Sequence, residues 1–286
     1  MLPGDHSMGG GEPDGDGLVT YTLNSYGYRA NKFDFGESEI LYTGCSQTYG
    51  RGVKMDSVWG ELIASKLGKS ATNIGRDGAG IASLVDSVYI YLANNKKPEK
   101  IYALFPDLGR LDTIINKKYA TTQDGKSMFS SSRSYAPIYH SGVVDHNFGL
   151  ALSGIHVLKN EYKTKIAKSP YALEDVYPYE ESMYKNIRAI KQLEILCNLL
   201  GIEFMWSTWS APFEGSIKKL QDIGYEFKNY VPTGCSAWVK HNGEYPKLDC
   251  HSDLEAEHAG YFHIACDKIG HIGAHHHIHI SEVFCA

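Results

Sequence analysis

The stretch "ILYTGCSQTYGRG", from Ile40 to Gly52, sets the organisation of this chain. An apolar run that is typical of a short buried strand ends in Gly-Cys-Ser, and glycines lie on both sides of the turn that follows. The serine in this turn, Ser46, is either an ordinary turn residue or a nucleophile held at the end of a strand. Features elsewhere in the sequence distinguish the two interpretations.

Strand and helix patterns alternate along the chain outside this stretch. Helical spacing of apolar residues is found at 55–68, where Gly68 marks the end, and again at 80–95, at 181–201 and at the C-terminal end. Short strand patterns lie at 70–75, 98–107 and 202–209. The alternation predicts an α/β protein in which a parallel sheet has helices on both faces. Sites in such sheets lie at the carboxyl ends of the strands, where Ser46 would be.

Composition and charge exclude several classes of function. The 286 residues are 43% hydrophobic and 21% charged, as in an ordinary globular protein, and the net charge of −5 gives no basic face for nucleic acid. No apolar run approaches the ~20 residues that span a bilayer, so we expect no membrane partner. Residues 1–19 lack the apolar core of a signal peptide and are predicted to form a flexible arm. We therefore expect a cytoplasmic protein, or a virion component if the source is viral.

Residues 20–286 are interpreted as one domain with an insertion at about 119–178. The inserted segment is rich in Ser and Tyr and has weak periodicity. We predict that it is partly helical around 150–165 and lies over an edge of the sheet. A long irregular segment in a compact domain is either functional or a solvated excursion.

Hydrolysis by a serine needs a base, a group that orients the base, and donors for the oxyanion. The stretch "NIGRDGAG" after the second strand offers glycine amides, among them Gly78, that can approach a substrate closely. Near the C-terminus, "FHIACDKIGHIGAHHH" places Asp267 four residues before His271, ahead of a predicted helix. The sequence thus holds every part that such a site requires.

Four stretches in order resemble the SGNH, or GDSL-like, hydrolases, in a branch with Gly-Cys-Ser that is common among phage and marine microbial sequences. They are "NSYGYRANKF", "TGCSQTYGRGV" with Trp59 and "LIASKLG", "NIGRDGAG", and "FHIACDKIGHIGAHHHIHISEVF". The resemblance covers about residues 20–115 and 180–286. It implies a three-layer α/β/α, flavodoxin-like fold.

The same resemblance implies the roles of individual residues. Ser46 would be the nucleophile, His271 the base, and Asp267 the carboxylate that orients it. Gly78 would supply an oxyanion amide, and Asn73 belongs to the same oxyanion and substrate-binding block.

The chain also departs from the family pattern. The third block usually carries Gly-x-Asn-Asp, whose asparagine is an oxyanion donor, but here the third strand ends in "ALFPDLGR". An ionised Asp107 would repel an oxyanion, and Arg110 is the candidate that would stabilise it instead. The family's acid normally lies three residues before the histidine, not four. A rival pair lies upstream, where His258 follows Glu255 and Asp253. We favour Asp267 and His271, since the pattern around them fits the last block better.

Three functions remain open at this stage. The first is a serine esterase that hydrolyses an O-acyl ester, on a glycan or a short-chain substrate, through an acyl-enzyme and without a cofactor. The second is an inactive domain of the same shape that binds sugar or has a structural role in a virion. The third is a metal site built on His275 and His279, which share a helix face, with His258, His263 or Asp253 as further ligands.

Overall fold

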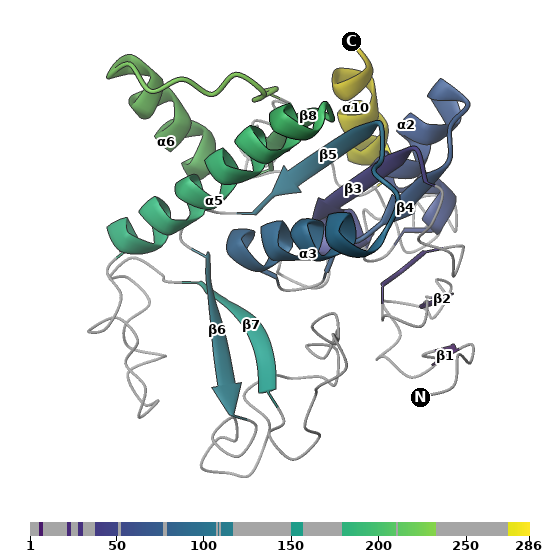
Figure 1. The fold of residues 1–286 in the computed structure, drawn as a ribbon, viewed down its shortest axis with the longest axis horizontal. Coiled ribbons are helices and arrows are strands. Elements are labelled where there is room, and N and C mark those ends of the chain that lie inside the picture. The colour runs from purple at the N-terminus through teal and green to yellow at the C-terminus, as the bar shows by residue number, and fades with distance from the viewer. Residues whose placement is uncertain are drawn as a thin grey trace, which may run out of the picture.

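The computed structural model of the chain describes residues 6–7, 22–23, 28–30, 38–50, 53–76, 79–106, 108, 110–116, 150–156, 179–209, 211–232 and 274–286. Its centre is a four-stranded sheet made of β3 (Ile40–Gly44), β4 (Ala71–Asn73), β5 (Lys100–Phe105) and β8 (Glu203–Thr208). All neighbouring strands are parallel, in the order β4-β3-β5-β8 (Figure 1). This order matches the first four strands of the flavodoxin-like arrangement, and the predicted parallel sheet is confirmed.

Helices cover both faces of this sheet. One face packs against α2 (Trp59–Leu67) and α10 (Ala274–Cys285), and the other against α3 (Ile81–Asn94) and α5 (Tyr179–Leu200). Successive strand residues point to opposite faces, so Tyr42 and Leu104 lie in the first core and Leu41 and Ala103 in the second. The three-layer α/β/α class is therefore confirmed.

The predicted helix boundaries agree with the structure. The stretch at 55–68 forms the 3-10 turn η1 (Met55–Ser57) and then α2. Gly68 and Gly201 end α2 and α5 in the left-handed conformation, with φ of 63° and 64°. One further helix, α6 (Ala211–Asp222), follows β8. Its signal in the sequence is the helical spacing of buried Phe213 and Ile217.

The segment after β5 departs from the prediction. β6 (Arg110–Asn116) pairs antiparallel with β7 (Leu150–His156), apart from the main sheet. The helix predicted at 150–165 is therefore wrong over 150–156. The strand takes its backbone partners from a segment more than thirty residues away, and local periodicity does not report such pairing. Most of the predicted insertion, 119–149 and 157–178, lies outside the described residues.

The predicted N-terminal arm is described only at one point. The two-residue strand β1 (His6–Ser7) pairs antiparallel with β2 (Thr22–Leu23). The rest of residues 1–19 lies outside the described part of the chain.

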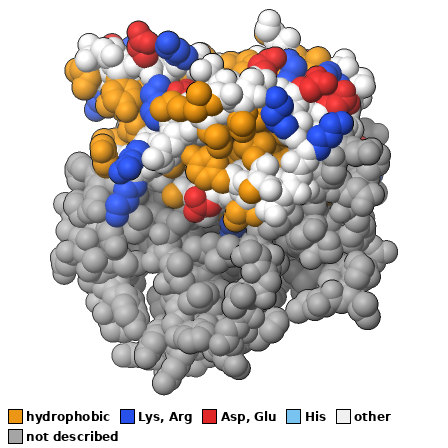
Figure 2. All heavy atoms as spheres, viewed as in Figure 1, with side chains coloured by type: hydrophobic (Ala, Val, Ile, Leu, Met, Phe, Trp, Pro, Cys, Tyr) orange, Lys and Arg blue, Asp and Glu red, His pale blue; other side chains and the backbone are white. Residues whose placement is uncertain are grey.

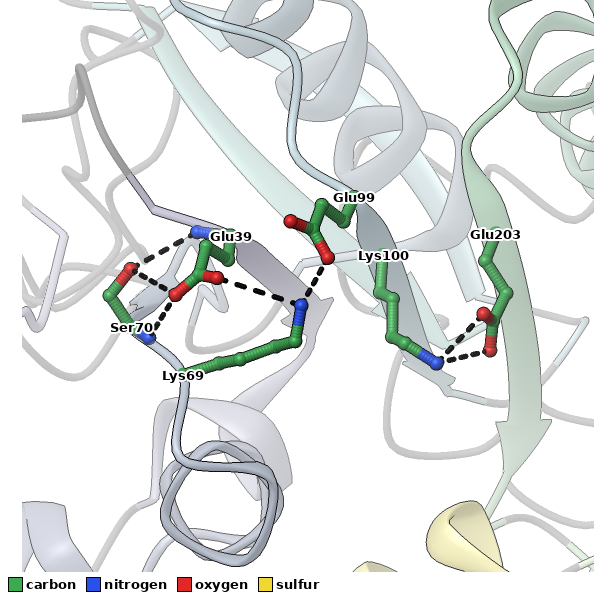
Figure 3. A network of polar contacts seen from close by, with 6 residues as sticks. All are labelled: Glu39, Lys69, Ser70, Glu99, Lys100 and Glu203. Atoms are coloured by element: carbon green, nitrogen blue, oxygen red, sulfur yellow. Dashed lines mark hydrogen bonds and ion pairs between the residues drawn. The ribbon is translucent and has the colours of Figure 1, made fainter.

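Charged side chains line the amino ends of the sheet strands (Figure 3). Lys100 and Glu203, cross-strand partners in the register, are joined at 2.7 Å, and Lys69 pairs with both Glu39 and Glu99. The Ser70 backbone N–H donates to the Glu39 carboxylate, and this hydrogen bond is the main reason that the pKa of Glu39 is lowered. These ion pairs are exposed to solvent, so each contributes little to stability. The edge of the sheet at the amino ends of the strands is therefore a solvated surface.

The face viewed in Figure 2 carries hydrophobic side chains over α3 and α5. The large apolar side chains exposed on α5 are Tyr184, Ile195, Leu199 and Leu200. They point away from the inner face of α5, where Ile190 and Leu193 pack into the core. Among the helices of the described residues, none has both the length and the hydropathy needed to cross a membrane.

Candidate active site

Ser46 lies where the sequence predicts it. It is the first residue of the short helix α1 (Ser46–Tyr49), directly after the carboxyl end of β3. The strand order changes direction here, because the chain passes from β3 to β4 on one side and then to β5 on the other. Open α/β sheets bind ligands at this crevice. Ser46 is 7% exposed, and its hydroxyl makes a long contact of 3.9 Å with Cys45 Sγ.

The turn before Ser46 requires a glycine. Gly44 has φ of 157°, and a Cβ there would overlap the Thr48 hydroxyl and lie 2.5 Å from the Leu104 carbonyl oxygen. α1 therefore folds back closely against the ends of β3 and β5. The glycine that the sequence shows before Cys45 is explained by this close approach.

Asn73, at the end of β4, holds α1 from one side. Its Nδ2–H donates to the Thr48 carbonyl at 2.9 Å, and its Oδ1 accepts the Gly75 N–H at 2.7 Å. The side chain is fully buried. This geometry favours a positioning role for Asn73, and direct contact with an oxyanion stays a prediction.

Arg29 holds the other end of α1. Its guanidinium donates to the carbonyl oxygens of Tyr49 at 3.0 Å, Val53 at 2.6 Å and Gly50, and lies over the Tyr49 ring at 5.8 Å. Arg29 is only 2% exposed. The stretch "NSYGYRANKF" thus contributes a buried cation that fixes the loop after the candidate nucleophile, a role that no sequence pattern indicates.

Trp209 is a site residue that the sequence did not reveal. It follows β8, yet its indole N–H donates to Cys45 Sγ at 3.2 Å, so the side chain reaches across the end of β5. Trp209 is half-buried, beside the fully buried Cys45 that precedes Ser46. Its one signal in the sequence is a tryptophan placed just after a strand, at the edge where sites lie.

The other predicted site residues are described partly or not at all. Asp267, His271 and Gly78 lie outside the described residues, and so do the rival residues His258, Glu255 and Asp253. Arg110 begins β6, where its backbone pairs with His156, and its side chain is not described. The structure therefore brings Ser46 and Asn73 to one edge of the sheet and leaves the base and acid as predictions.

The C-terminal histidines lie on α10, as expected. His276 and His277 are buried, at 7% and 0% exposure, whereas His279 is half-buried. The Nδ1 of His277 accepts the backbone N–H of Trp59 at 3.1 Å, so this lone pair is not free for a metal. Within the described residues no three His, Cys, Asp or Glu side chains are grouped as a metal site would need. The side chain of His275, and His258 and His263, fall outside that set.

Comparison with known proteins gives a distant structural likeness. No family model matches the sequence, and no curated protein matches it. Among solved structures, the chain is similar to a protein assigned to the lipolytic G-D-S-L family, from Desulfitobacterium hafniense DCB-2. The match covers 87% of this chain and 98% of that chain, with 9% identity and a TM-score of 0.43. Similarity at this level does not establish a family, and the α/β/α class rests on this chain's own sheet and helices.

Proposed function

We propose that the protein is a serine esterase that hydrolyses an O-acyl ester through an acyl-enzyme. The observation that carries this proposal is Ser46 itself. It stands at the carboxyl end of β3, at the switch in strand order, on a turn that needs Gly44 and is held by Asn73 and Arg29. An ordinary turn serine has no need of so much buried support, whereas a nucleophile must be held in one geometry.

The reaction follows the usual two steps of serine hydrolysis. His271 takes the proton of the Ser46 hydroxyl as Oγ attacks the ester carbonyl, and Asp267 orients the imidazole. The alcohol leaves with that proton. Water then attacks the acyl-enzyme as His271 takes a proton from it, the acyl–Oγ bond breaks to release the acid, and His271 returns the proton to Ser46. Among the described residues, Ser46 Oγ makes the long contact of 3.9 Å with Cys45 Sγ, and the proposed base His271 lies outside them.

The oxyanion would be held mainly by backbone amides. Among the described residues the Ser46 N–H has no hydrogen-bond acceptor, because Ser46 is the first residue of α1 and the first N–H groups of a helix have no partner within it. Gly78 is the proposed second donor, and Arg110 the proposed substitute for the missing asparagine. Arg110→Ala should lower kcat at least tenfold if the guanidinium faces the oxyanion, and a change under twofold in a folded variant would remove that role.

The proposed substrate is a small O-acyl group on a glycan, or a short-chain ester. Trp209 supports this choice, since an amphipathic aromatic ring in contact with Cys45, the residue before Ser46, suits contact with a sugar face. A preference for acetylated sugars over simple short-chain esters, lost in Trp209→Ala, would support the glycan.

The test is labelling by a fluorophosphonate probe, which reacts with activated serines. Wild type should be labelled and should hydrolyse a short p-nitrophenyl ester, and Ser46→Ala should lose both properties while remaining folded. Ser87→Ala, which removes a similarly buried serine on α3, is the matched control and should keep both. Undiminished hydrolysis by Ser46→Ala would refute the nucleophile.

Two further outcomes decide among the alternatives. His271→Ala should cost roughly 3–5 orders of magnitude in rate and His258→Ala far less, and the reverse order would move the base upstream. A wild type that is neither labelled nor active would favour the binding or virion-structural domain. Activity that a chelator abolishes would favour the metal site.

A further inference from the structure

The first turn of α10 is attached to the start of α2 by a buried histidine. His277 is 0% exposed, and its Nδ1 accepts the backbone N–H of Trp59, 218 residues earlier in the chain. Trp59 is the first residue of α2, and the N-cap residue Val58 makes no side-chain capping bond. The imidazole therefore satisfies one of the N–H groups that a helix start leaves without a partner.

Trp59 continues this connection to the candidate nucleophile. Its indole N–H donates to Thr48 Oγ1 at 3.3 Å, and Thr48 lies in α1, two residues after Ser46. The ring is fully buried and lies edge-on to Tyr42, with centroids 5.3 Å apart. Trp59 thus joins the turn that carries Ser46, through its indole N–H, to the first turn of α10, through its backbone N–H.

The loop that carries the proposed base leads directly into this turn. α10 begins at Ala274, three residues after His271. The first turn of α10 is therefore adjacent in sequence to the proposed base and is joined to the turn of Ser46 through Trp59 and Thr48.

We propose that His277 and Trp59 form a clamp that couples the first turn of α10 to the turn of Ser46 and so holds the nucleophile in position. The inference rests on the proposed function and adds two positioning residues to it. His277 is not itself the base, because its Nδ1 lone pair is engaged by the Trp59 N–H and its ring is fully enclosed. It acts through the docking of α10, as Trp59 acts through Thr48.

A positioning role and a merely structural one predict different results. His277→Leu removes the acceptor, whereas His277→Asn keeps an oxygen near the place of Nδ1. Ile280→Ala is the control, since Ile280 is a fully buried residue of α10 that makes an apolar contact, and its loss costs about 2–5 kcal/mol of stability. Trp59→Phe removes the indole N–H and keeps the backbone N–H and most of the ring.

The variants are compared by kcat, KM and the rate of fluorophosphonate labelling at Ser46, at a temperature well below every Tm. His277→Leu should lower kcat and labelling at least tenfold with KM changed less than twofold, and His277→Asn should recover to within about threefold of wild type. Trp59→Phe should lower kcat at least threefold. Ile280→Ala should stay within twofold of wild type although its Tm falls.

Several outcomes would overturn the clamp. One is a loss in Ile280→Ala equal to that in His277→Leu, which would show a general effect of stability. Another is unchanged kcat in His277→Leu, or, if that variant does not fold, unchanged kcat in Trp59→Phe. In either case a labelled wild type leaves the proposed function standing. An unlabelled wild type removes the proposed function and the clamp together.

Discussion

Asn73 gives the sharpest test of how the turn around Ser46 is held. Asn73→Ala removes a fully buried amide that satisfies the Thr48 carbonyl and the Gly75 N–H. Each buried backbone group left without a partner costs about 1–3 kcal/mol, so the two together cost about 2–6 kcal/mol. Water entering the space of the amide would recover part of this, and we expect a loss of about 2–4 kcal/mol in the free energy of unfolding.

Asn73→Asp separates the two hydrogen bonds. It keeps the size and the Oδ1 that accepts the Gly75 N–H, but it places a carboxylate oxygen 2.9 Å from the Thr48 carbonyl, where Nδ2 now donates. The ionised form is disfavoured there, so the pKa of the new carboxyl in the folded protein rises above its unfolded value. A group whose pKa is raised in the folded protein contributes less to stability as pH rises. The free energy of unfolding of this variant should therefore fall relative to that of wild type between about pH 4 and pH 7.

The assay is urea unfolding at pH 4.5 and pH 7, with Ser46 labelling measured on the same samples. Both variants should also lower the labelling rate, because α1 loses its support on the β4 side. A loss below about 1 kcal/mol in Asn73→Ala would refute the reasoning. So would a stability of Asn73→Asp that follows wild type across the pH range.

Two other predictions concern groups enclosed by the fold. Burial, with smaller effects of His276 and Arg29, lowers the pKa of His277 to about 3, so the unfolded chain binds a proton below about pH 6.5 that the folded one does not. The free energy of unfolding of the wild type should therefore fall by up to about 1.4 kcal/mol per pH unit as pH falls from 6.5 toward 3. In His277→Asn the free energy of unfolding should depend less on pH over this range. Equal pH dependence of the two proteins in urea unfolding would contradict this. Burial raises the pKa of the Cys197 thiol to about 12, whereas Cys285 is exposed. Iodoacetamide at pH 8 should alkylate Cys285 in the native protein and Cys197 only after denaturation, and mass spectrometry showing rapid native labelling of Cys197 would argue against this core.

The sequence by itself determined the four strands of the main sheet, the helices α2, α3, α5 and α10 beside it, and their order along the chain. The apolar runs at 40–44 and 202–209 became strands that are buried on both faces of the sheet. The periodic stretch at 80–95 became α3, because its apolar residues recur on one face of a helix. The glycine stops at 68 and 201 followed from the left-handed conformation that ends a helix. Once the strands are parallel, Ser46 must lie at the carboxyl edge, so its place was predictable too.

Tertiary structure alone decided what surrounds Ser46. Asn73 reaches Thr48, Trp209 reaches Cys45, and His277 reaches Trp59, over separations in sequence of 25, 164 and 218 residues. The strand at 150–156 belongs to the same class, because its pairing with β6 supplies the backbone hydrogen bonds that its own neighbours do not. Periodicity reports how a residue relates to others a few positions away, whereas these contacts exist only because packing of the sheet and helices brings distant polar groups within hydrogen-bond reach and encloses them from water.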